Sequence, residues 1–262
     1  PSVSVVAKAR AFPTIDSSCA FRIGYKIISY LNTGSVDSGS SMCLAGNEGA
    51  GYTAGLARFS TQYGSALQVI NIYKADPNYK KEFDAFIPTL QKYASQQSGT
   101  LAGLDGFCDA WTRASGNGDY FKGAQFTAMR TLFDKPALDY TSDLGPRYPI
   151  TKSAILDTLL MNGFGNSGEA LGASVAATNA AFTSDTAGNS ASTVTAGSVS
   201  VDEIVWLSKF LDIRDQRTNG KDAAHSDAYR SLIKSGLYTL DSALKFTDYN
   251  GNSVSVNCDG LV

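Results

Sequence analysis

Apolar residues recur at helical spacing in one segment after another of this 262-residue chain. Phe21, Tyr25 and Ile28 fall on one face of a helix that is expected to end at Gly34. Further helices are predicted over residues 64–76, 80–93 (interrupted near its proline), 119–133, 152–161, 202–214 and 222–236. A chain with this many amphipathic helices is restricted to a fold of the mainly α class.

Only short strands are expected beside these helices. Residues 42–44 predict one strand, which leads into a glycine-rich turn. Residues 245–258 predict a hairpin around Asn250 and Gly251, a dipeptide that favours the tight turn between two strands. The fold class is therefore mainly α with a small β part (α+β).

One domain is expected to cover residues 1–262, because neither an internal repeat nor a linker divides the sequence. Residues 1–18 read as an N-terminal extension, with alternating polar and apolar residues that stop at Pro13. Residues 183–200 are almost entirely Ser, Thr, Ala and Gly with few large apolar side chains. They are predicted to form a mobile low-complexity loop.

Charge and hydropathy exclude two classes of partner. The chain has a net charge of −2 and a pI of about 5.4, whereas nucleic-acid binding calls for a basic face. No apolar run approaches the roughly 18 residues that cross a bilayer. We therefore expect no nucleic-acid partner, no membrane partner and a monomer.

The four cysteines, Cys19, Cys43, Cys108 and Cys258, are widely spaced and form no C-x-x-C pair. This pattern favours two disulfides, with three possible pairings, over a zinc site or a redox motif. Disulfides persist in oxidising compartments. Together with a first residue that is not Met, they predict a processed protein that is secreted and extracellular.

Residues 48–55, Glu-Gly-Ala-Gly-Tyr-Thr-Ala-Gly, carry the sequence feature closest to a known signature. They resemble the Asp-Gly-Arg-Gly-Tyr-Thr-x-Gly segment of the family 46 chitosanases, which belong to the lysozyme superfamily. The resemblance implies that Glu48 takes the place of a catalytic carboxylate. It also implies that Thr53 helps to hold the attacking water.

Three later segments extend this resemblance over about residues 21–250. The run from Phe210 to Arg214 matches a Phe-Leu-Asp-x-Arg motif, and His225 with Arg230 matches a His followed five residues later by Arg. Asp157 matches an Asp late in a core helix. The resemblance implies a buried ion-pair network of Asp157, Arg214 and Arg230 beside the site. Such a cluster is costly in a core unless its members are paired, so their helices should converge.

The same resemblance implies a lysozyme-like, two-lobed helical fold with a small β part beside the cleft. It also implies a secreted glycoside hydrolase that cleaves β-1,4 linkages of an amino-sugar polysaccharide, with chitosan as first choice. Tyr52 is a candidate platform for a sugar ring, as is Tyr148, whereas Trp111 and Trp206 are expected in the core. No cofactor and no metal are implied, and His225 is expected to have a structural role.

Three positions depart from the family pattern. Asn32, sixteen residues before Glu48, stands where the family has its general-acid Glu. Ala50 replaces an Arg, and Ser65 replaces an acidic residue that grips a glucosamine amine. An amide cannot protonate a leaving oxygen, and loss of a general acid typically costs about 10²- to 10⁴-fold in rate.

These departures leave several hypotheses open. Asp37 could supply the second carboxylate, which an inverting enzyme needs about 6.5–9.5 Å from the first. Alternatively, Glu48 could act alone with help from the substrate's N-acetyl group, which favours chitin or peptidoglycan and a lysozyme-like (muramidase) activity. A third alternative is a catalytically inactive polysaccharide-binding relative, in which Asn32 and Ser65 contact sugar without cleavage.

Overall fold

The structure is a computed structural model that describes residues 19–36, 39–46 and 51–259. The N-terminal extension, Asp37, Glu48 and Ala50 lie outside the described residues. No helix in the described part is long and apolar enough to span a bilayer.

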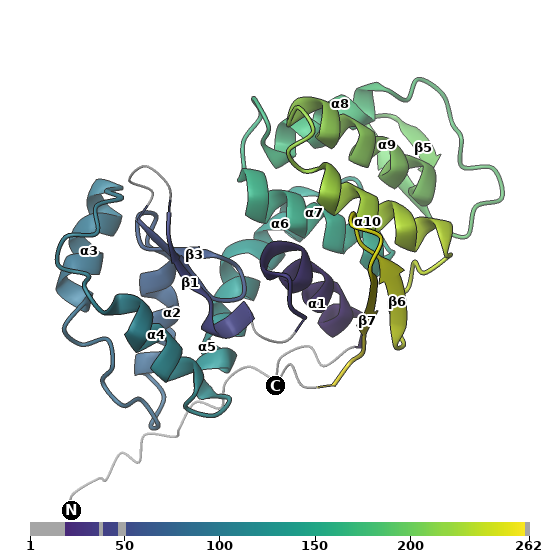
Figure 1. Ribbon diagram of the computed structural model, residues 1–262. Coiled ribbons are helices and arrows are strands. Elements are labelled where there is room, and N and C mark those ends of the chain that lie inside the picture. The colour runs from purple at the N-terminus through teal and green to yellow at the C-terminus, as the bar shows by residue number, and fades with distance from the viewer. Residues whose placement is uncertain (1–18, 37–38, 47–50, 260–262) are drawn as a thin grey trace, which may run out of the picture.

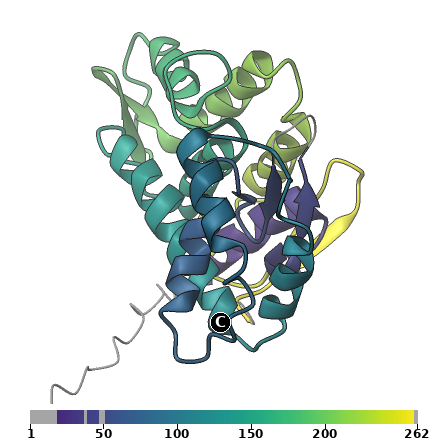
Figure 2. The same cartoon turned by 90° about the vertical axis from the view of Figure 1, so that its left-hand side faces the viewer.

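The described chain forms two lobes, which stand side by side in Figure 1. The first lobe, which faces the viewer in Figure 2, holds a three-stranded antiparallel sheet and most of the early helices. Its elements are β1 (Cys43–Ala45), β2 (Tyr52–Ala54), β3 (Phe59–Ser60), α2 (Ser65–Lys74), α3 (Ile87–Gln96), α4 (Phe107–Ser115) and α5 (Tyr120–Met129). A π-helical turn, η3 (Arg130–Asp134), continues α5 into the second lobe.

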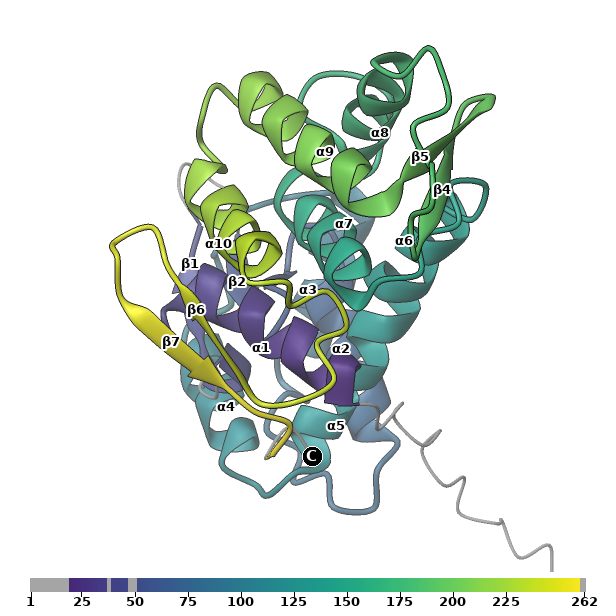
Figure 3. The same ribbon diagram turned by 90° about the vertical axis from the view of Figure 1, so that its right-hand side faces the viewer.

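The second lobe is built on α7 (Pro149–Asn162), whose residues 150–151 and 153–159 are buried. The other helices of this lobe are α6 (Lys135–Tyr140), α8 (Leu171–Ala180), α9 (Glu203–Arg217) and α10 (Ala223–Lys234). The first helix, α1 (Cys19–Thr33), packs on α7, and the hairpin β6 (Leu244–Thr247) and β7 (Ser253–Val256) lies beside α1 in Figure 3. The mainly helical, lysozyme-like, two-lobed fold with a small β part is as predicted.

Both tryptophans lie in the core, as expected. Trp111 is fully buried in the first lobe among phenylalanine rings, including Phe107 and Phe121. Trp206 is fully buried in the second lobe and stacks on Phe210, with ring centroids 5.1 Å apart. Each lobe thus has one fully buried tryptophan in its core.

Residues 183–192 contain neither helix nor strand, as predicted, but the prediction of a loop is wrong for residues 193–200. An antiparallel hairpin forms there, with strands β4 (Thr193–Ala196) and β5 (Val199–Asp202). Val194 and Ala196 are buried, and the backbone N–H of Thr195 donates to the carbonyl of Leu144. The alternation of β-branched and small residues in this segment outweighed its low complexity.

The predicted helix over residues 80–93 is wrong in its first half, because α3 begins only at Ile87. Pro88 lies in the first turn of α3 and does not interrupt a helix. Proline is favoured there, since the first N–H groups of a helix have no intrahelical partner. Helices α4 and α8 were not predicted at all. Both are short. The buried face of α8 is made mostly of small residues that give little periodic signal, whereas α4 buries Phe107, Ala110, Trp111 and Ala114 at helical spacing and could have been predicted.

Two disulfides are present, as the cysteine count predicted. Cys43 of β1 is bonded to Cys108 of α4, which fastens the sheet to the first lobe. Cys19, at the start of α1, is bonded to Cys258 near the other end of the chain.

Candidate active site

The small sheet of the first lobe depends on glycines of the Glu48–Gly55 motif. Gly51 and Gly55 have φ values of 71° and 73°, which side chains rarely adopt. A Cβ on Gly55 would lie 2.3 Å from Oε1 of Gln125, which accepts a hydrogen bond from the N–H of Leu56. These glycines therefore let the turn after β2 pack directly on the helices below it.

Thr53 lies in the middle of this sheet, on β2. Its backbone pairs with Leu44 of β1 on one side and Ser60 of β3 on the other. The neighbouring Tyr52 stacks one face of its ring on Phe107, with centroids 5.5 Å apart. The sheet thus fixes both predicted site residues on its central strand.

A groove of about 400 Å³ lies between the two lobes. The first lobe contributes β3 and α2, including Ser65, which was expected to contact sugar. The second lobe contributes the end of α7, and η3 closes the groove. The lining residues are Ala57, Arg58, Ser60, Tyr63, Ser65, Gln68, Leu132, Phe133, Leu159, Leu160 and Gly163.

Asn32 lies in the last turn of α1. Its Nδ2 donates a hydrogen bond of 2.9 Å to the carbonyl of Ile28, whereas its Oδ1 is buried and has no partner within the described chain. An unpaired buried oxygen is costly. The side-chain oxygen of Asn32 is thus a buried acceptor without a hydrogen bond from any described residue.

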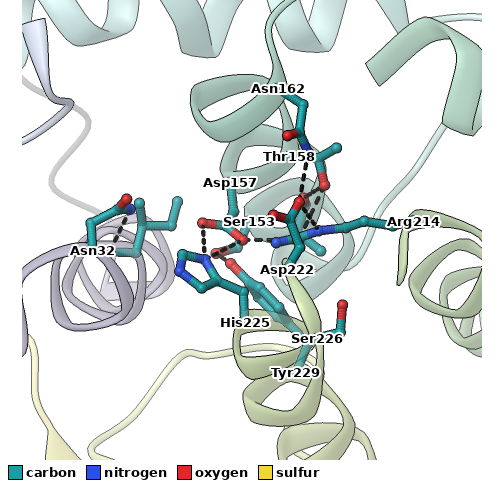
Figure 4. A network of polar contacts seen from close by, with 12 residues as sticks. Asn32, Ser153, Asp157, Thr158, Asn162, Arg214, Asp222, His225, Ser226 and Tyr229 are labelled. Atoms are coloured by element: carbon teal, nitrogen blue, oxygen red, sulfur yellow. Dashed lines mark hydrogen bonds and ion pairs between the residues drawn. The ribbon is translucent and has the colours of Figure 1, made fainter. Parts of the chain in front are cut away.

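The second lobe contains a buried cluster of charges, drawn in Figure 4. Arg214 of α9 is fully buried between two carboxylates: its Nη1 lies 2.9 Å from Asp157 of α7, and its Nε lies 3.0 Å from Asp222. Asn162 donates a 2.6 Å hydrogen bond from Nδ2 to Asp222. The predicted contact between Asp157 and Arg214 is therefore present.

The second side chain paired with Asp157 is His225 and not Arg230. Nδ1 of His225 lies 3.0 and 3.1 Å from the two oxygens of Asp157. Arg230 instead pairs with Asp212, Asp215 and Asp227 on a partly exposed face of the same helix. The expectation that Arg230 joins the buried network is wrong, because the helix turns its residue 230 away from α7.

The charges around Asp157 decide its protonation state. Burial alone would raise the pKa of Asp157, but the charges of His225 and Arg214 and the hydrogen bonds from both outweigh burial and lower it. The pKa of Tyr229, buried on the next turn of α10, is raised well above its usual value by burial and by the nearby charge of Asp157. Asp157 is thus an ionised carboxylate beside a neutral phenol.

Sequence reasoning missed Asp222 and the contact of His225 with Asp157. Asp222 lies just before α10, so it read as a helix-start residue like many others. His225 is the only histidine of the chain and lies three residues further on. A histidine one turn into a helix gave no sign that its ring faces a carboxylate from residue 157.

The remaining predicted residues are placed as follows. Tyr148, the other candidate platform, packs on Tyr238 with ring centroids 5.4 Å apart. The catalytic candidates Glu48 and Asp37 lie outside the described residues. Within the described ranges, no three His, Cys, Asp or Glu side chains are arranged to hold a metal ion.

A mainly helical chain of two lobes, with a small sheet beside the groove between them, has the lysozyme-like architecture. A sequence profile of glycosyl hydrolase family 46 matches residues 26–244. The chain is also 30% identical to the chitosanase of Bacillus subtilis (strain 168) over 210 residues, which are 76% of this chain and 71% of that protein. This chain belongs to glycosyl hydrolase family 46.

Solved structures agree with this assignment. The native chitosanase from Bacillus subtilis MY002 superimposes with a TM-score of 0.73 at 25% identity, covering 90% of this chain and 98% of that chain. The family 46 chitosanase of Gynuella sunshinyii in complex with chitotetraose gives a TM-score of 0.73 at 26% identity, covering 90% and 97%. The resemblance predicted from four short motifs is confirmed, and the chain is a glycoside hydrolase.

Proposed function

We propose that this glycoside hydrolase cleaves β-1,4 linkages of chitosan, with Glu48 as a catalytic carboxylate. The observation that carries the proposal is the match to family 46 over residues 26–244, which includes the whole Glu48–Gly55 motif. Relatives named chitosanases have been solved with chitotetraose and, for a variant of the Bacillus subtilis MY002 protein, with six GlcN units. The groove between the lobes is the place where such a chain would bind.

In this proposal Thr53 orients water or sugar near Glu48, and Asn32, Tyr52 and Ser65 contact the substrate. Tyr52 keeps one ring face for a sugar, since Phe107 covers the other. Asp157 and Arg214 brace the second lobe from behind the groove. Asp37 is retained as an alternative second carboxylate. The enzyme acts as a monomer on a polysaccharide outside the cell, where its two disulfides would persist.

A second candidate substrate is an N-acetylated polymer, chitin or peptidoglycan. The specific observation in its favour is the charge of the groove: Arg58 is exposed there, and no carboxylate is among the described lining residues. A cationic side chain repels the protonated amines of chitosan but tolerates neutral acetamido groups. Ser65, in place of an acidic residue, acts in the same direction.

One experiment tests class and substrate together. The wild-type protein and a Glu48→Gln variant are incubated with chitosan, colloidal chitin and bacterial cell walls, and the new reducing ends are measured. We expect release from chitosan that falls at least 10²-fold in the variant. Equal activity of the variant and the wild type would remove Glu48 from the mechanism. Binding without cleavage would support the inactive relative.

A further inference from the structure

We propose that Arg58, Ser60 and Ser65 form a subsite of the groove that selects an N-acetylated sugar unit, so that the preferred polymer is a partially acetylated chitosan. The inference rests on the proposed function and goes beyond it, because it assigns residues of this chain to the acetamido group itself. All three side chains line the groove of about 400 Å³ between the lobes.

The guanidinium of Arg58 is a charge without a counterion in the described chain. Arg58 is exposed in the groove, and its side chain makes no ion pair or hydrogen bond with any described residue. A guanidinium has several N–H donors and no acceptor. The described lining residues also include no carboxylate. The groove is therefore positive at this point and offers no described anionic partner to a protonated amine.

The backbone of Arg58 adopts a conformation that favours glycine. Its φ is 51°, and its N–H donates to the carbonyl of Gly55 over 3.1 Å in the turn between β2 and β3. A residue with a Cβ costs free energy there, and such residues are concentrated at functional sites. Because Arg58 is exposed, core packing does not offset the cost. The turn fixes the point from which this side chain extends.

Two hydroxyl groups in the same groove keep a donor for a ligand. Oγ of Ser60 accepts hydrogen bonds of 3.1 and 3.3 Å from the backbone N–H groups of residues 62 and 63. Oγ of Ser65 accepts one of 2.8 Å from the N–H of Ser60. Neither hydroxyl donates to a described residue. The backbone thus holds both oxygens in place, while each O–H hydrogen is left for an acceptor in the groove.

The part of the groove that η3 and α7 contribute is apolar. Figure 1 shows α7 in the lobe opposite to β3 and α2, which carry the two serines. The apolar side chains are Leu132, Phe133, Leu159 and Leu160.

An acetamido group fits both kinds of surface. Its carbonyl oxygen accepts hydrogen bonds, which Arg58 and the serines can donate, and its methyl group prefers apolar neighbours. A protonated amine fits neither surface. It has no acceptor for these donors, it is repelled by the guanidinium, and it loses hydration beside leucine side chains. The described groove therefore discriminates between the two substituents in favour of the acetylated one.

The test measures binding, which does not depend on cleavage. Calorimetric titration in the cold compares a glucosamine tetramer with tetramers that carry one N-acetyl group at each position in turn, and mass spectrometry verifies that the sugars stay intact. We expect one singly acetylated tetramer to bind about 10-fold more tightly than the deacetylated one. In Arg58→Gly this preference should fall below about 3-fold, and Arg58→Glu should favour the deacetylated tetramer.

Lys81→Gly is the matched control. Lys81 is also an exposed cation with a positive φ, of 66°, but it is not among the residues that line the groove. This variant should keep the preference of the wild type. Both glycine variants should melt no lower than the wild type, because glycine adopts a positive φ without strain. Thermal unfolding thus separates a lost preference from a lost fold.

If Arg58→Gly does not fold, the wild-type protein is titrated at rising salt. Salt screens the repulsion between Arg58 and an amine, so the preference for the acetylated tetramer should shrink. Equal affinity of the wild type for all tetramers, or an unchanged preference in Arg58→Gly, would overturn the assignment. A preference without cleavage of any chitosan would refute the proposed function and support the subsite. Cleavage without a preference would do the reverse.

Discussion

Glu203 accepts a hydrogen bond of 2.8 Å from the backbone N–H of Tyr148, the residue that precedes α7. The N–H of Arg147 and the hydroxyl of Ser192 donate to the same carboxylate, which is fully buried. One acid at the start of α9 therefore supplies acceptors to the beginning of α7, where backbone N–H groups have no helical partner. Since α7 carries Asp157, Glu203 helps to position the helix that contributes Asp157 to the buried cluster.

We predict that Glu203→Ala lowers the free energy of unfolding by about 3 kcal/mol, because it leaves buried donors unpaired. Glu203→Gln keeps one acceptor and should cost less. Glu169→Ala, which removes an exposed partner of Lys221, is the control and should leave the urea midpoint unchanged. Urea unfolding followed by circular dichroism makes the comparison, and an equal midpoint for Glu203→Ala and wild type would contradict the prediction.

The buried Asp157 should make stability depend on pH. Because the pKa of Asp157 is lower in the folded protein than its ordinary value of 3.8, its stabilisation is present above about pH 4 and is lost as the pH falls through the folded pKa. Asp157→Asn should lose about 3–5 kcal/mol at neutral pH, since Arg214 keeps its buried charge. The free energy of unfolding of Asp157→Asn should also fall less than that of the wild type as the pH drops below about 4. Asp139→Asn, which breaks an exposed pair with Lys135, is the control and should keep the pH dependence of the wild type. If Asp157→Asn also kept the wild-type pH dependence, this role for Asp157 would be contradicted.

Gly55 should not tolerate a side chain. Gly55→Ala forces a residue with a Cβ into a φ of 73° and against Gln125, so we expect a loss of more than about 2 kcal/mol. Gly123→Ala is the matched control, because nothing lies within 4 Å of its added Cβ and it is inside α5. That change should stabilise the protein by up to about 1 kcal/mol. Thermal unfolding of both variants checks the opposite signs, and a stabilised Gly55→Ala would contradict the account of this turn.

Each disulfide should add measurable stability. Replacing both cysteines of a pair by serine is expected to cost about 2–5 kcal/mol. The entropic argument predicts about 1 kcal/mol more for Cys19–Cys258, which closes 239 residues, than for Cys43–Cys108, which closes 65. Guanidinium unfolding of the two double variants measures this difference. A larger loss for the shorter loop would show that local packing outweighs chain entropy.

The helices that carry a long apolar face were predictable from sequence, as α1 and α9 illustrate. Their period repeats over 15 residues, and their ends are marked by Gly34 and by Asp202, whose side chain caps α9. The hairpin β4–β5 was not predictable in the same way. Its buried residues, Val194, Ala196 and Val201, are few and lie among small polar residues.

The buried cluster shows where prediction of the site reached its limit. The pairing of Asp157 with Arg214 followed from motif order and from the cost of unpaired buried charge. The choice between His225 and Arg230 did not, because both lie on α10 and differ only in which way the helix faces. That rotation is set by contacts such as Tyr229 with Ser153, which no local pattern encodes.

The bond between Cys19 and Cys258 makes a covalent ring of the chain between them. A single proteolytic cut at an exposed connection within that ring, for example near Gly188, would open the ring without releasing a fragment. The two pieces would migrate as one molecule until a reducing agent was added.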